Sequence, residues 1–130
     1  MIVNFGPAIR GYLENALQVK VFPQKPATRP PKCIVVQQIP GPSNAKPLHL
    51  AWRRYLVHYW DASDVSGDAV GELGEEIRLA VLNLRYANLG VHRIGIMGEP
   101  GIYNDPKEST PRGQLTVDVL LKSRPRLNVN

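Results

Sequence analysis

Residues 98–122 read GEPGIYNDPKESTPRG and then QLTVDVLLK, a segment rich in proline and glycine followed by an alternating one. The second part alternates apolar and polar residues over 114–122, which predicts a half-buried strand. Its inward side consists of Leu115, Val117, Val119 and Leu121, and its outward side of Gln114, Thr116, Asp118 and Lys122. The first part, 98–113, contains prolines, glycines and an Asn-Asp-Pro turn, which predicts a long loop. Because long loops usually have a function and this one has few reactive groups, we expect it to make contacts rather than perform catalysis.

Length and composition predict one folded domain over residues 1–130, since 43% of the residues are apolar. Cys33 is the only cysteine, so we expect no intrachain disulfide and no cysteine-based metal site. We interpret it as a small buried hydrophobic residue. No apolar run reaches the ~18 residues that a membrane span requires, and the N-terminus lacks a signal-peptide pattern. We therefore expect a protein with no membrane association that folds in a reducing compartment.

The net charge of +5 conceals a segregation of the two signs. Residues 15–60 contain no acidic residue, whereas residues 61–108 contain nine. The cations of the first segment are Lys20, Lys25, Arg29, Lys32, Lys46, Arg53 and Arg54. Such segregation is typical of a nucleic-acid-binding surface, or of a basic surface on one copy that binds an acidic surface on the next. We favour the second interpretation, because 23–48 lacks the aromatic residues that stack on bases.

The remaining patterns predict an α+β domain in which a sheet of about five strands, mainly antiparallel or mixed, packs against one long helix. A short helix opens at Gly6-Pro7 and runs to residue 17, since proline suits the first helical turn. The predicted strands are 18–22, 33–39, 50–61, 92–97 and 114–122, and the main helix is 64–87. The proline-rich segments 23–31 and 40–47 are predicted loops. The tail 124–130 is expected to be flexible or docked on a partner. The order is α-β-β-β-α-β-β.

The strand 50–61 has apolar residues on both sides, which predicts that both sides are covered. One cover is the domain's own helix, and the other is a second layer or another subunit. Arg53 and Arg54 are adjacent on this strand and should therefore point to opposite faces.

The main helix carries two apolar stripes. The first is the predicted core face, formed by Val70, Leu73, Ile77, Val81 and Leu84. The second consists of Leu79, Leu82 and Tyr86, and either the N-terminal helix packs on it or it is a subunit interface. Three glycines, Gly67, Gly71 and Gly74, share one side of the helix, which indicates close approach of another backbone.

The predicted ends of the main helix rest on residue types that favour helix caps. Ser63 or Ser66 is expected to cap its start, and Asn88 and Gly90 suit its end.

No set of residues matches a catalytic, cofactor or metal site. The chain lacks a glycine-rich phosphate loop, and Gly71 and Gly74 lack a following Lys-Ser or Lys-Thr pair. His49, His58 and His92 match no ligand spacing. No serine occupies a nucleophile elbow. We therefore expect neither enzymatic activity nor a cofactor.

The order of these elements and three motifs resemble the tail-terminator (tail-completion) proteins of long-tailed bacteriophages. The motifs are VFP at 21–23 with RP at 29–30, YWD at 59–61 before the main helix, and YNDP at 103–106 with TPR at 110–112 before the last strand. The resemblance covers nearly the whole chain. The glycines in the first half of the main helix depart from it, since such proteins more often have an alanine-rich helix there.

The resemblance implies a structural virion protein at the phage neck, assembled in the host cytoplasm. Such proteins form a hexameric ring on the last tail-tube ring, stop its polymerisation and present the joint to the head-completion (stopper) protein. Genomic DNA passes through the lumen without specific binding. A ring needs two different complementary patches on each copy, which the basic span 20–54 and the acidic span 61–76 would supply. Alternatives are a stopper, a tail-tube subunit or, in a different class, a small basic nucleic-acid-binding module.

The residues expected at subunit or partner contacts fall into three groups. Lys25, Arg29 and Lys32 form the basic group, Leu79, Leu82 and Tyr86 the helical group, and Tyr103, Asp105, Pro106 and Arg112 the loop group. The loop group is expected to contact the neighbouring copy or the tube.

Overall fold

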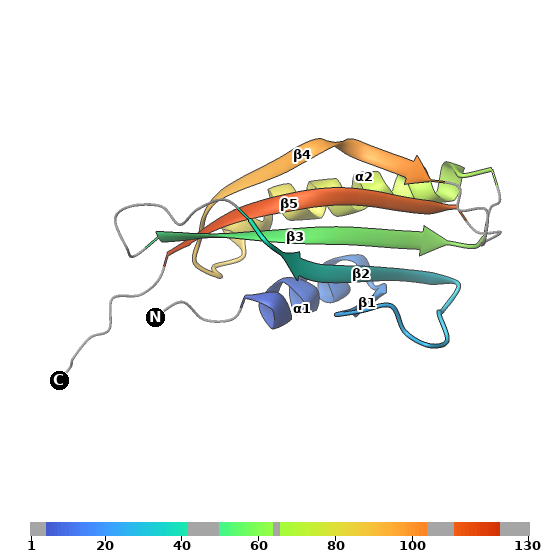
Figure 1. The fold of residues 1–130 in the computed structure, drawn as a ribbon, viewed down its shortest axis with the longest axis horizontal. Coiled ribbons are helices and arrows are strands. Elements are labelled where there is room, and N and C mark those ends of the chain that lie inside the picture. The colour runs from blue at the N-terminus through green and yellow to red at the C-terminus, as the bar shows by residue number, and fades with distance from the viewer. Residues whose placement is uncertain (1–4, 42–49, 64–65, 104–110, 123–130) are drawn as a thin grey trace.

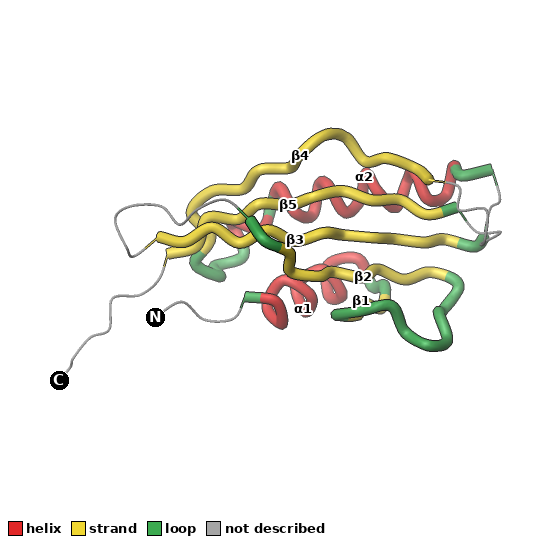
Figure 2. The backbone as a smooth tube through the Cα atoms, in the orientation of Figure 1, coloured by secondary structure: helices red, strands yellow, loops and turns green. Residues whose placement is uncertain are grey.

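The computed structural model describes residues 5–41, 50–63, 66–103 and 111–122, with the backbone alone at residues 50 and 98–103. Its elements follow the order α1 (Gly6–Leu17), β1 (Lys20–Phe22), β2 (Lys32–Ile39), β3 (Leu50–Asp61), α2 (Asp68–Leu82), η1 (Leu84–Tyr86, a 3-10 helix), β4 (Val91–Tyr103) and β5 (Arg112–Lys122). The five strands form one sheet in the order β1-β2-β3-β5-β4 (Figures 1 and 2). β1 pairs with β2 in parallel, and the other neighbours are antiparallel. The predicted α+β class is confirmed.

The core lies between one face of this sheet and both helices. Successive strand residues point to opposite faces, so the face that packs on the helices is the one with Tyr55, Val57 and Tyr59 on β3. The predicted inward side of β5 is confirmed, since Leu115, Val117, Val119 and Leu121 are all buried there. From the helices, the core receives Ile9 and Leu13 of α1 and Val70, Leu73, Ile77 and Val81 of α2.

The N-terminal helix matches its prediction. α1 has Pro7 in its first turn and ends where Gln18 adopts a left-handed conformation with φ of 56°. Because Gln18 ends α1, the following strand begins at Lys20 rather than at residue 18. The strand predicted over 50–61 is confirmed, and the one predicted over 33–39 begins one residue earlier.

The main helix is shorter at both ends than predicted. α2 begins at Asp68 because Gly67, with φ of 93°, has a left-handed conformation that cannot continue a helix. Of the two predicted serines, Ser63 does not cap the helix, because it donates from its amide and hydroxyl to Asp61 Oδ1 at 3.0 and 2.6 Å. The Ser66 hydroxyl oxygen accepts from the amide of Asp68, the first residue of α2, at 3.3 Å, although the N-cap position itself is Gly67. At the other end, the α-helical hydrogen bonding stops at Leu82. The left-handed Asn88 and Gly90 lie beyond η1, in the turn before β4.

The predicted loop 98–113 is wrong at both ends, where residues 98–103 belong to β4 and residues 112–113 to β5, and residues 104–110 lie outside the described part of the chain. β4 continues to Tyr103 and β5 begins at Arg112, so the strand predicted over 92–97 is also too short. The register shifts between the pair Met97–Thr116 and the pair Gly101–Gln114. Pro100 lies within this bulge on an outer strand, the position where a strand tolerates a residue without an amide proton.

Two further predicted segments, the loop over 40–47 and the tail 124–130, lie almost entirely outside the described residues.

Candidate interaction surfaces

The second face of the sheet carries the first candidate surface, which we call the open face. In antiparallel pairs, residues directly opposite each other lie on the same face. The open face therefore consists of Cys33, Val35 and Gln37 on β2, Trp52, Arg54, Leu56, His58 and Trp60 on β3, Arg112, Gln114, Thr116, Asp118, Leu120 and Lys122 on β5, and Arg93, Gly95 and Met97 on β4. Both helices pack on the other face (Figure 1). In the part of the chain that the structure describes, no helix covers the open face.

One corner of the open face is covered by the chain between β1 and β2. Cys33, Val35 and Trp60 form a small buried cluster with Phe22 packed against it. The Arg29 guanidinium carbon lies 4.9 Å from the centroid of the Trp60 ring, which is a cation–π contact. Burial raises the pKa of the Cys33 thiol, although the Arg29 charge opposes this. The interpretation of Cys33 as a buried hydrophobic residue is confirmed, since a raised pKa disfavours the reactive thiolate.

An ion pair crosses the middle of the open face. Arg54 Nε and Nη2 donate to Asp118 Oδ1 and Oδ2 at 2.7 and 2.9 Å. This bidentate geometry is the strong form of the arginine–carboxylate contact, and the hydrogen bond raises the pKa of Arg54. Asp118 points away from the core as predicted, yet it is only 8% exposed. Its charge is therefore compensated within the chain.

The rest of the open face combines aromatic, apolar and positively charged side chains with the uncharged polar side chains of Gln37, Gln114 and Thr116. Trp52, Leu56 and His58 are half-buried on β3. Met97 lies two strands away on β4, opposite Thr116 of β5, and is 51% exposed. Burial, and secondarily the charge of Arg112, lowers the pKa of His58, which favours its neutral form. Tryptophan and arginine are enriched among residues that contribute most to protein–protein binding. This composition is that of a binding surface rather than of a solvated sheet face.

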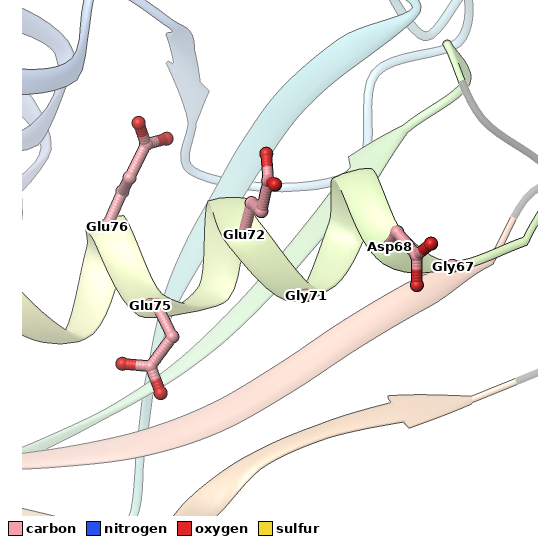
Figure 3. A pocket seen from close by; sticks show the side chains of 6 residues that line it. All are labelled: Gly67, Asp68, Gly71, Glu72, Glu75 and Glu76. Carbon is pink, nitrogen blue, oxygen red and sulfur yellow. The ribbon is translucent and has the colours of Figure 1, made fainter.

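The second candidate surface, the acidic ridge, follows the exposed side of α2. It consists of Asp68, Glu72, Glu75 and Glu76, which line a shallow groove of about 660 Å³ together with Gly67 and Gly71 (Figure 3). Arg78 donates to Glu75 at 3.0 Å and is the one cation on α2. Within the described ranges, no cluster of three or more His, Cys, Asp or Glu side chains could hold a metal ion.

The acidic ridge continues into an exposed apolar patch formed by Leu79, Leu82 and Tyr86. These side chains are 52%, 41% and 71% exposed. The alternative in which the N-terminal helix packs on them is wrong, because α1 approaches a different side of α2. There the Tyr12 hydroxyl donates to the carbonyl of Ala80 at 2.7 Å. The apolar patch therefore remains available for a partner.

Among the three glycines near the start of α2, Gly74 meets a side chain where close approach of another backbone was predicted. Gly74 packs against the Tyr59 side chain, Gly71 lines the shallow groove, and Gly67 precedes the helix.

The structure brings together some of the residues predicted at contacts and separates others. Lys25 is exposed between β1 and β2, whereas Arg29 lies on Trp60 and Lys32 stands opposite Asp61 at the start of β2. The basic group therefore does not form one continuous surface.

The loop group is only partly described. Tyr103 pairs with Arg112 across β4 and β5, and Asp105 and Pro106 lie outside the described residues. Arg112 is half-buried on the open face.

Sequence reasoning missed Trp52, Arg93 and the Arg54–Asp118 pair as parts of one surface. The alternation of β3 places Trp52 and Arg54 on one face and Arg53 on the other, so the sequence alone indicated that Trp52 and Arg54 share a surface. The neighbours on β4 and β5 depend on register, which the sequence does not show.

No protein-family model matches this chain, and no curated protein sequence is similar to it. Neither α1 nor α2 is long and apolar enough to cross a lipid bilayer.

Proposed function

We propose that this protein is a structural virion component, a tail terminator that forms a ring on the end of the phage tail tube. In this role it stops polymerisation of the tube and provides the joint to the head-completion protein, while genomic DNA passes through the lumen. The order α-β-β-β-α-β-β, on which the resemblance rests, agrees with the element order of the structure.

The observation that carries the proposal is the open face. It holds half-buried tryptophan, leucine and arginine side chains on β3 and an exposed methionine on β4, and none of the helices in the described ranges packs on it. Burying such a face on a partner removes apolar area from water at about 25 cal/mol per Å². A surface of this kind, without an accompanying constellation of reactive groups, fits an assembly subunit better than an enzyme.

A nucleic-acid-binding module is the alternative from another class. The open face is basic and aromatic, as such a module requires. However, Trp60 is only 3% exposed and already packs under Arg29, so Trp52 is the one tryptophan of this face left to stack on a base, and a series of stacking rings is lacking among the described residues. We therefore favour a protein partner.

Electron microscopy of negatively stained particles tests the proposal. The purified protein is imaged alone and after mixing with tail tubes of the phage that encodes it. We expect sixfold rings that cap tube ends, and we expect no cylinders longer than one ring. Long cylinders formed by the protein alone would identify a tube subunit instead, and a ring that binds head-completion protein but never tubes would identify a stopper. A monomer that binds DNA with a steep salt dependence would refute the assembly role.

A further inference from the structure

We infer that the acidic ridge and apolar patch of one copy dock on the open face of the next copy. The inference rests on the proposed ring, because the partner it names is a second copy of this chain. It adds which surfaces meet and in what arrangement.

The charges of the two surfaces are complementary. The acidic ridge carries four carboxylates against the single guanidinium of Arg78. On the open face, the Asp118 carboxylate is already compensated by Arg54. Among the described residues, Arg93 on β4 and Lys122 on β5 add positive charge that no second carboxylate on this face offsets. Arg93 and Lys122 are exposed. Complementary charges of this kind steer association and set which surfaces can pair.

The apolar parts of the two surfaces also correspond. The acidic ridge runs into Leu79, Leu82 and Tyr86, and the open face offers Trp52, Leu56 and Met97 between its cations. The 15 residues of α2 span about 22 Å at the rise of an α-helix. The 12 residues of β3 span about 40 Å at the rise of a strand. The sheet is therefore long enough to receive the exposed side of α2 along its whole length.

The positions of the two surfaces determine the symmetry of the contact. α2 packs on one face of the sheet and the open face is the other, so the two surfaces lie on opposite sides of one copy (Figure 1). They cannot meet within one copy. A two-fold contact would require both surfaces to lie in the same interface, which surfaces on opposite sides of one copy cannot do. The contact is therefore heterologous, with the helix side of each copy on the sheet side of the next, and such contacts close into rings when the rotation permits.

Two charge-reversal variants test this arrangement by size-exclusion chromatography with light scattering. The sheet variant carries Arg93→Glu and Lys122→Glu, and the ridge variant carries Glu72→Lys and Glu76→Lys. All four side chains are exposed, so both variants should fold. We expect each variant alone to require at least about tenfold more protein for half-assembly than the wild type.

An equimolar mixture of the two variants is the decisive measurement. In an alternating ring, the reversed sheet of one variant meets the reversed ridge of the other, and the remaining contacts are native. We therefore expect the mixture to assemble as the wild type does, which also shows that both variants are folded.

The outcomes separate the inference from the proposed function. A wild-type protein that stays monomeric refutes both. If the wild type forms rings but either variant alone assembles equally well, the docking arrangement is wrong and the ring stands. The same conclusion follows if the mixture fails to assemble although circular dichroism shows that both variants are folded.

Discussion

Tyr59 is held between two glycines, and replacing either glycine by alanine should overpack the core. Tyr59 is fully buried on β3, with Gly74 of α2 against its hydroxyl and Gly113 of β5 against its ring. A Cβ atom added at Gly74 would overlap the hydroxyl oxygen and lie 2.9 Å from Cζ. One added at Gly113 would lie 2.7 Å from Cδ2 and overlap Cε2 and Cζ.

The two substitutions should differ in cost. Overpacking a core costs about 1–3 kcal/mol, and alanine in a helix interior recovers up to ~1 kcal/mol relative to glycine. Gly74→Ala lies inside α2 and should therefore destabilise by about 1–2 kcal/mol. Gly113 lies in a strand, so Gly113→Ala gains no helix propensity, and its added Cβ overlaps ring carbons. We therefore expect it to destabilise the protein by about 2–3 kcal/mol.

Urea unfolding at one fixed protein concentration measures both values, and Tyr59→Phe identifies the overlapping atom. Removing the Tyr59 hydroxyl should relieve the overlap that Gly74→Ala creates. We therefore expect a favourable coupling of roughly 1 kcal/mol between the two substitutions in a double-mutant cycle. It should leave Gly113→Ala uncoupled within error, because the ring carbons remain. The reasoning is refuted if Gly113→Ala is as stable as the wild type, or if Tyr59→Phe couples to both glycines equally.

Three further predictions concern stability. Gly11→Ala should stabilise the protein by about 0.5–1 kcal/mol in urea unfolding, because a Cβ there meets nothing within 4 Å; destabilisation would contradict the described packing of α1. Asp118→Asn should destabilise by about 1–3 kcal/mol because it leaves Arg54 half-buried without its carboxylate, and adding Arg54→Met should recover part of the loss. Burial and the charge of Arg112 lower the pKa of His58 in the folded protein, so His58 in the unfolded chain binds a proton at higher pH. The free energy of unfolding should therefore decrease as pH falls below about 6.5. His58→Gln should reduce this decrease between pH 7 and 5, and an unchanged slope would show that another group causes it.

The elements with a clear period were predictable from the sequence. The alternation along β5 and the length of β3 required no information from distant residues, and neither did the proline at the start of α1. The wrong predictions concern residues whose types are compatible with two different structures. Pro100 and the glycines around it indicate a loop in isolation, but an outer strand with a bulge accommodates the same residues.

The charge of the acidic ridge was predictable from the sequence, whereas that of the open face was not, because its exposed cations Arg93 and Lys122 lie outside the predicted basic span 20–54. The segregation of acidic and basic residues along the chain is visible in the sequence, and the exposed stripe of Leu79, Leu82 and Tyr86 follows from helical spacing. Two other features depend on pairs far apart in the chain. Asp118 is buried because it meets Arg54, 64 residues away, and Arg29 lies on Trp60 because the chain between β1 and β2 folds back over the sheet.

The two outer strands of the sheet limit the growth of an assembly by strand addition. β1 has three residues, and β4 at the other edge combines Pro100 with two register shifts. Neither edge presents the long, regular row of free amides and carbonyls that templates another strand. Growth by continuous hydrogen bonding, the route to amyloid-like fibres, is therefore disfavoured at both edges. The folded protein can thus remain at high concentration without aggregating through the edges of its sheet.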